Sequence, residues 1–336
     1  MASVTIRDVA KYAGVGVGTV SRVLNGSEAV SEATRHKVLT AIAALDFAPN
    51  QTARRLSLGK SYTVAVIVPF LTYPSYVDRI RGVESVFVET DYDFLIYNAE
   101  SPERRQRYLA EVARGERFDG SILMTLAPDE KTITRFRTRH LPCVVVEGVQ
   151  PELNRVVIDN VYGGYLATKH LIDLGHTRIG YVTDYLESRF PSQPIYDRFI
   201  GYCQALEEAD LPYRADYVVQ GRHGRDEGRD LAHQLLAMAD PPSAIFAYSD
   251  TQAFGILEAA RQRGLQVPED LSVIGFDDIE ISQYLNLTTV SQSLFASGVV
   301  AARMLLHLMN DGGAATICEE LPAELIVRGT TAPPAG

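Results

Sequence analysis

The sequence is poor in residues that build disulfide or metal frameworks. Its three cysteines, Cys143, Cys203 and Cys318, are far apart and odd in number. They therefore predict free, at least partly buried thiols, and neither a disulfide framework nor a metal knuckle. None of the seven histidines forms the i, i+4 pair of a helical zinc site. We expect no metal and no cofactor.

Long apolar runs are also missing. No stretch approaches the roughly eighteen consecutive apolar residues of a membrane-spanning helix. The first eight residues lack the basic-then-apolar pattern of a secretory signal. With 46% apolar and 22% charged residues, the 336-residue chain has the composition of a globular protein with two or three domains. A cytoplasmic location is expected.

Motifs of common enzyme classes are absent. The glycines of residues 14–18 do not have the G-x-G-x-x-G spacing, and they follow a helical pattern where a dinucleotide loop would follow a strand. There is no G-x-S-x-G elbow and no P-loop lysine. Asp277 and Asp278 are neighbours, so on a strand they would point to opposite sides, which is unsuitable for a catalytic carboxylate pair. We therefore expect that the protein is not an enzyme.

Negative charge dominates the chain but not its first sixty residues. That segment has eight lysines and arginines against four acids, a net charge of +4. Because the whole chain carries −10, the remainder carries −14. This asymmetry favours a polyanion-binding end on an acidic body.

Three short helices are predicted at the basic end. Apolar residues recur at helical spacing over 6–13, which Gly14 ends, and over 17–24, which Asn25-Gly26 ends. Ser31 is a good N-cap for a third helix that carries Val38 and Leu45. Pro49 closes the unit, and the basic residues 50–60 are typical of a linker or marginal helix.

The second of these helices has the residues of a DNA-reading helix. Arg22 lies off its apolar stripe and can donate two hydrogen bonds to a guanine. Thr19, Ser21 and Asn25 suit phosphate oxygens, while Val17 could touch a thymine methyl beside the shallow Gly18. Three small helices with a basic face are also compatible with a protein-docking module.

After residue 62, short apolar runs alternate with amphipathic stretches. The clearest runs are 64–68, 94–97, 121–124, 144–146, 179–182, 244–247 and 273–276. Such alternation predicts parallel sheets covered by helices on both faces. The runs are too many for one compact sheet, so we expect two α/β lobes. In such sheets ligands bind beyond the carboxyl ends of the strands, which places a ligand cleft between the lobes.

Several motifs together resemble one protein family. Residues 4–15, 19–25, 30–35 and 47–56 resemble the headpiece signature of the LacI/GalR family of bacterial transcription regulators. Residues 157–160, 170–176, 198–202, 273–278 and 325–328 resemble its body. The motifs occur in the family's order and cover nearly the whole chain. The resemblance implies an all-α helix-turn-helix headpiece and a two-lobed α/β body like that of periplasmic sugar-binding proteins.

For the headpiece, the resemblance implies a homodimer on a double-stranded, pseudo-palindromic DNA operator, and hence association with the nucleoid when it is bound. Residues 50–58 would be a hinge helix in which Leu56 wedges into the minor groove beside Ala53. Thr5 and Asn50 would be further DNA contacts. The chain departs from the family at Gly16 and Gly18, so operator specificity is expected to depend on Arg22, Val17, the hinge and DNA shape.

For the body, the resemblance implies a small effector between the lobes. The matching positions are Tyr76, Arg198, His223, Ser249, Asp250, Asp277 and Gln292. A guanidinium and a carboxylate at Arg198 and Asp277 could each hold two vicinal hydroxyls. Asp250 could equally cap a helix, and Tyr76 could equally pack in the core. A sugar effector is expected; a nucleobase corepressor is the alternative.

The resulting interpretation is a repressor of sugar-utilisation genes whose effector shifts the dimer geometry required by the hinge. A secreted solute-binding protein would share the body but has no use for residues 1–60. We predict a headpiece over 1–49, a hinge over 50–60, a two-lobed effector-binding and dimerisation domain over 61–330 and a tail over 331–336. Residues 188–197 are expected to form a loop at the cleft mouth.

Overall fold

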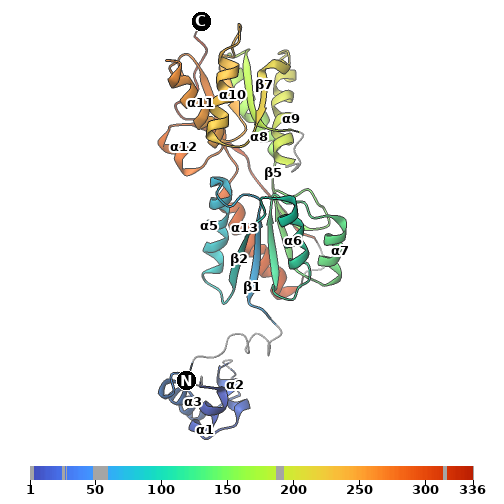
Figure 1. Ribbon diagram of the computed structural model, residues 1–336, viewed down its shortest axis with the longest axis vertical. Coiled ribbons are helices and arrows are strands. Elements are labelled where there is room, and N and C mark those ends of the chain that lie inside the picture. Colours follow the sequence, from blue (N-terminus) through green and yellow to red (C-terminus); the bar gives the residue numbers. More distant parts are fainter. Residues whose placement is uncertain are drawn as a thin grey trace. The chain divides into compact units, whose positions relative to one another are not determined.

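The computed structural model describes residues 4–24, 27, 29–47, 60–186, 193–312 and 316–335. It divides into two compact units, Met1–Ser61 and Tyr62–Gly336, which we call the headpiece and the body (Figure 1). This boundary lies within one residue of the predicted start of the body. Among the described residues, no helix combines the length and apolar character needed to cross a bilayer.

The headpiece contains the three predicted helices, α1 (Ile6–Ala13), α2 (Val17–Leu24) and α3 (Glu32–Ala44). Asp8 in the first turn of α1 accepts hydrogen bonds from the backbone N and the hydroxyl of Thr5, at 2.9 and 2.7 Å, and thereby fixes the helix start. Gly14 ends α1 in a left-handed conformation, with φ of 66°. Ser31 occupies the N-cap of α3, as predicted.

Buried side chains from all three helices form the headpiece core. Val9 of α1, Val20 of α2 and Val38 of α3 are fully buried in it, and Phe47 closes it. These residues have the helical spacing found in the sequence, so packing of the three apolar stripes positions α2. The exposed face of α2 is thereby left to solvent.

The body contains two lobes, each built on a six-stranded sheet. In the first lobe all strands are parallel, in the order β11 (Cys318–Leu321), β5 (Asn154–Ile158), β4 (Cys143–Val146), β3 (Gly120–Met124), β1 (Thr63–Val68), β2 (Asp93–Asn98). Helices α5 (Pro74–Phe87) and α13 (Leu294–Asp311) pack on one face. Helices α6 (Pro102–Val112) and α7 (Glu130–Thr138) pack on the other (Figure 1).

The second lobe repeats this arrangement. Its strand order is β12 (Glu324–Ile326), β10 (Thr288–Ser291), β9 (Ser272–Asp277), β8 (Ala244–Ala247), β6 (Ile179–Asp184), β7 (Val218–Gly221). Only β12 is antiparallel to its neighbour. Helices α8 (Asn160–Asp173) and α9 (Gln193–Glu208) cover one face, and α10 (Arg225–Leu236) and α11 (Asp250–Gln262) cover the other. The 3-10 turn η1 (Ala215–Tyr217) and helix α12 (Glu280–Tyr284) complete it.

The chain passes between the lobes three times: from β5 to α8, from β10 to α13 and from β11 to β12. Two of these passages contain the buried residues Asn160 and Gln292. Helices α8 and α9 approach so closely that a Cβ at Gly201 would lie 2.0 Å from the carbonyl oxygen of Val161. This tight crossing sets the position of Arg198, one turn before Gly201, relative to Asn160.

One local prediction is wrong. Residues 193–197, predicted as part of a loop, form the first turn of α9, because Pro194 suits the start of a helix. The predicted tail is held against the second lobe, where Thr331 contacts His170 at 2.9 Å and the Ala332 carbonyl accepts from His176 at 2.8 Å. Residues 188–192 of the predicted loop lie outside the described residues.

Candidate functional site

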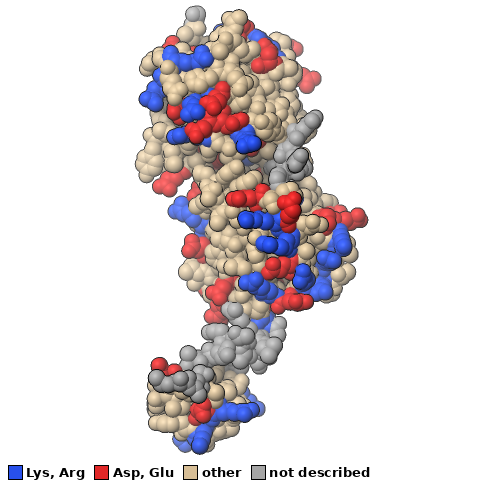
Figure 2. Space-filling model, in the orientation of Figure 1, with Lys and Arg blue, Asp and Glu red and all other residues tan. Residues whose placement is uncertain are grey.

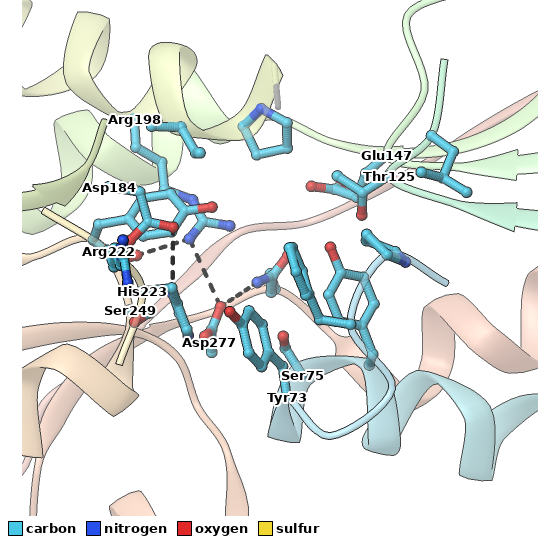
Figure 3. A pocket seen from close by; sticks show the side chains of 18 of the residues that line it. Tyr73, Ser75, Thr125, Glu147, Asp184, Arg198, Arg222, His223, Ser249 and Asp277 are labelled. Atoms are coloured by element: carbon cyan, nitrogen blue, oxygen red, sulfur yellow. Dashed lines mark hydrogen bonds and ion pairs between the residues drawn. The ribbon is translucent and has the colours of Figure 1, made fainter. Parts of the chain in front are cut away.

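A cavity of about 380 Å³ lies between the lobes at the carboxyl ends of the strands. This volume falls within the range of small-molecule sites. Its wall combines aromatic, carboxylate and guanidinium groups from both lobes (Figure 3). Lining residues labelled there are Tyr73, Ser75, Thr125, Glu147, Asp184, Arg198, Arg222, His223, Ser249 and Asp277.

Arg198 is held firmly in this wall. It is 3% exposed, and its Nε and Nη1 donate to Asn160 Oδ1 and to the Tyr248 carbonyl, both at 2.8 Å. The guanidinium lies 3.7 Å from the centroid of the Phe276 ring and 4.6 Å from that of Tyr248. Because these contacts fix the plane of the guanidinium, it is preorganised for a ligand.

Asp277 at the end of β9 faces Arg198, with 3.7 Å between an Oδ and Nη1. Its carboxylate accepts from Gln292, whose amide oxygen accepts from Arg79 at 2.7 Å. Burial raises the pKa of Asp277 although Arg198 and Arg79 oppose the rise. The arrangement leaves a desolvated carboxylate that a hydroxyl donor would stabilise.

An aromatic stack forms another part of the wall. The rings of Phe70 and Tyr73 stack with centroids 4.6 Å apart, and Tyr73 and His223 stack at 4.3 Å. His223 Nδ1 lies 3.4 Å from an oxygen of Asp184. Burial, followed by the negative charge of Asp184, raises the pKa of Tyr73 to about 12. Its phenol is therefore a neutral donor at physiological pH.

Glu147, just after β4, provides a second carboxylate on the side of the first lobe. One oxygen accepts from Asn160 Nδ2 at 2.9 Å, which links it through Asn160 to Arg198. The other, Oε1, is buried and has no hydrogen-bond partner among the described residues. A buried acceptor without a donor is costly, so a ligand hydroxyl at Oε1 would be stabilising.

Of the predicted effector contacts, six line the cavity: Tyr76, Arg198, His223, Ser249, Asp277 and Gln292. Tyr76 also packs against the core of the first lobe, so its position is compatible with both predicted alternatives. Ser249 is the N-cap of α11 and accepts from the backbone N of Gln252 at 3.3 Å. These side chains, far apart in the sequence, therefore meet at one site.

The predicted effector contact of Asp250 is corrected by the structure, because this residue does not line the cavity. It is fully buried, and its oxygens accept from Ser282 and Thr289 hydroxyls at 2.6 and 2.5 Å and from the Ile279 N at 3.1 Å. Its carboxylate therefore ties α12 and β10 to the start of α11. It is a structural group behind the site.

Asp250 leads to a prediction about pH. Burial, followed by the charge of Asp277, raises the pKa of Asp250 to about 7. The folded state therefore keeps a proton that the unfolded chain loses near pH 4, so this group's contribution to stability falls as pH rises from about 4 to about 7. Asp250→Asn should become progressively more stable relative to the wild type over that window. Denaturant unfolding at several pH values measures this, and a stability difference independent of pH contradicts it.

The sequence alone did not single out five residues at or beside the cavity: Arg79, Glu147, Asn160, Asp184 and Tyr248. Glu147 and Asp184 follow or end parallel strands, so the rule that ligands bind beyond strand ends could have singled them out. Arg79 lies inside α5, where its sequence resembles that of any exposed helical arginine. Its burial becomes visible only when α5 and α13 are packed together.

The headpiece carries a separate candidate surface. Val17 is 43% exposed at the start of α2, and Gly18 and Arg22 are exposed with it, while Thr19 and Ser21 are partly buried at its edge. Further exposed lysines and arginines lie on the headpiece (Figure 2). The hydroxyl of Thr5 is engaged with Asp8. Of the predicted DNA contacts, Asn25, Asn50, Ala53 and Leu56 lie outside the described residues.

Two family patterns match the chain. Residues 5–50 match the bacterial regulatory proteins of the lacI family, and residues 168–331 match a periplasmic binding protein-like domain. Catabolite control protein A of Priestia megaterium is 34% identical over 98% of this chain and 99% of that protein.

Two solved structures of transcription regulators are similar to this chain over nearly its whole length. A Lac repressor dimer bound to operator and the anti-inducer ONPF has a TM-score of 0.87 at 28% identity, and the match covers 98% of this chain and 100% of that one. The transcriptional regulator CelR in complex with cellobiose has a TM-score of 0.71 at 31% identity, covering 97% and 99%. Both the headpiece and the two-lobed body are thus shared with proteins of known regulatory function.

Proposed function

Because the chain belongs to the LacI family and is a DNA-binding transcriptional regulator, we propose that it is a repressor whose operator affinity is set by a sugar bound between its lobes. The observation that carries this proposal is the pair Arg198 and Asp277, held 3.7 Å apart in the wall of the interlobe cavity. A fixed guanidinium beside a buried carboxylate suits the donors and acceptors of vicinal hydroxyls.

The polar groups of the wall favour a sugar over a nucleobase. A flat base sandwiched between two aromatic rings needs a gap of about two stacking distances between their faces, although a base can also stack on one face of a single ring. Here Phe70, Tyr73 and His223 stack directly on one another, at 4.6 and 4.3 Å, and leave no such slot between them. The wall instead offers carboxylates at Glu147 and Asp277 as acceptors for hydroxyl groups.

We propose that α2 of the headpiece enters the major groove. Arg22 would read a base edge, Val17 and Gly18 would approach the groove floor, and Thr19 and Ser21 would contact phosphates. The exposed face of α2 supports this assignment. A homodimer is proposed because the similar Lac repressor was solved as a dimer on its operator.

The coupling would run through the three chain passages between the lobes. Asn160 and Gln292 belong to two of them, and each is bonded to a cavity group, Arg198 or Asp277. A sugar that preferentially binds one arrangement of the lobes shifts the population toward it, and with it the geometry of the dimer. The operator affinity then changes by the free energy of that preference.

A ligand screen tests the proposal. We expect that a sugar, and no nucleobase, raises the melting temperature of the full chain, because binding to the folded state stabilises it by about 2.7 kcal/mol at a hundredfold excess over Kd. Asp277→Asn, which preserves the side-chain shape, should remove the shift. Stabilisation by a purine alone would contradict the proposal and favour a nucleobase effector.

A further inference from the structure

The guanidinium of Arg105 has no carboxylate partner among the described residues of the cavity wall. Arg105, on α6, lines the cavity and is partly buried. Its Nη2 donates to the carbonyl oxygen of Ala127 at 2.7 Å, and no carboxylate of the described ranges lies within ion-pair distance of it. Burial lowers the pKa of Arg105, and no neighbouring acid opposes this effect. The side chain is thus a partly desolvated cation facing the ligand space.

The more deeply buried charged groups of the wall have charged or amide side-chain partners, whereas Arg105 has only a backbone carbonyl in the described part of the chain. Arg198 faces Asp277 at 3.7 Å and His223 lies 3.4 Å from Asp184. Arg79 donates to Gln292 at 2.7 Å. A neutral sugar could occupy this cavity, but it would leave Arg105 desolvated without an anion, which is unfavourable.

We propose that Arg105 forms an oxyanion subsite, so that the effector is a hydroxylated ring bearing a phosphate ester or a carboxylate. This inference rests on the proposed function and names the chemical class of its effector. The anion would accept hydrogen bonds from the guanidinium, and a ring hydroxyl would donate to the unpartnered Oε1 of Glu147. One molecule would then supply partners for Arg105 and for Glu147 Oε1, two groups on the first-lobe side of the cavity.

The surroundings of Arg105 favour an anion. The same helix carries exposed Arg104 and Arg107, and Arg114 follows it. Basic side chains lie over the α6–α7 side of the first lobe with acidic ones between them (Figure 2), although the chain as a whole carries −10. From the second lobe, exposed Arg222 lines the same cavity. A local positive potential raises the concentration of anionic ligands at the mouth.

The test compares Arg105→Gln with Arg104→Gln in the full chain. Arg104 is on the same helix but exposed and outside the cavity lining, so its variant controls for the loss of one positive charge. The probes are inorganic phosphate, three hexoses (glucose, galactose and mannose), their 6-phosphates and the corresponding uronic acids. Melting shifts and calorimetric Kd values are measured for each probe.

We expect an anionic sugar to bind the wild type and Arg104→Gln with the same affinity. It should bind Arg105→Gln about tenfold or more weakly, because a charge-assisted hydrogen bond is lost. The phosphate and uronic-acid arms identify which oxyanion is bound. Phosphate binding that needs Arg105 without any sugar binding would support the subsite and contradict the sugar effector. Neutral hexoses that bind as well as their anionic forms would leave the proposed function intact and overturn the subsite. Absence of any Arg105-dependent binding also overturns it.

Discussion

Replacing Arg198 by methionine should abolish effector binding while leaving the headpiece able to bind DNA. Truncating one partner of a buried, hydrogen-bonded charge pair costs about 2–5 kcal/mol. Here the loss would fall on the second lobe, because Arg198 holds Asn160 and the Tyr248 carbonyl as well as facing Asp277. We expect no melting shift with the effector, and a lower melting temperature without it, since Asp277 is left buried and less compensated.

The control for this variant is Arg261→Met on α11, where the arginine is exposed. It removes the same charge from the same lobe and should bind effector as the wild type does. Calorimetric titration of the wild type, Arg198→Met and Arg261→Met with the effector measures the Kd of each protein. An unchanged Kd in Arg198→Met would exclude this arginine from the binding site and with it the geometry on which the sugar proposal depends.

Arg22→Ala should weaken binding to the cognate operator by about 1–3 kcal/mol and binding to random DNA much less. The reason is that Arg22 is exposed on α2 and can form two hydrogen bonds with a guanine edge. Lys37→Ala, an exposed cation on α3, should reduce operator and random DNA affinity by similar factors if it contributes at all.

Fluorescence anisotropy with both DNAs at fixed salt measures these affinities. The informative quantity is the ratio of operator to random-DNA affinity for each variant. If Arg22→Ala loses the same factor on both DNAs, its proposed base-reading role is wrong and the residue serves only as a phosphate contact.

The headpiece could be predicted closely from its sequence because its structure is local. Each helix carries its own apolar stripe and its own boundary residues, such as Gly14 and Ser31. The predicted central strands of both sheets were found for a similar reason, since strands buried on both faces are continuously apolar. Strand β11 is short and largely exposed, and β12 is a three-residue strand that is only partly buried, so they have no such signal.

The cavity could be predicted only in part. Arg198 and Asp277 were placed by family resemblance, but the contacts that fix them join residues from distant parts of the chain. Arg79 and Asp250 show why local sequence is insufficient. In the sequence Arg79 resembles a surface residue, but its side chain is buried at the site. Asp250 resembles a ligand contact, but its carboxylate accepts hydrogen bonds that hold neighbouring elements together. Their roles depend on packing between elements, which a single sequence does not encode locally.

The central claim is that the cavity between the lobes controls the headpiece. The most direct test measures operator affinity of the full chain with and without the sugar that stabilises it, using an operator selected from random DNA. The proposal predicts a change in Kd of about 5- to 150-fold, the usual range of allosteric coupling, that disappears in Asp277→Asn. An operator Kd that is the same with the cavity filled and empty would contradict it.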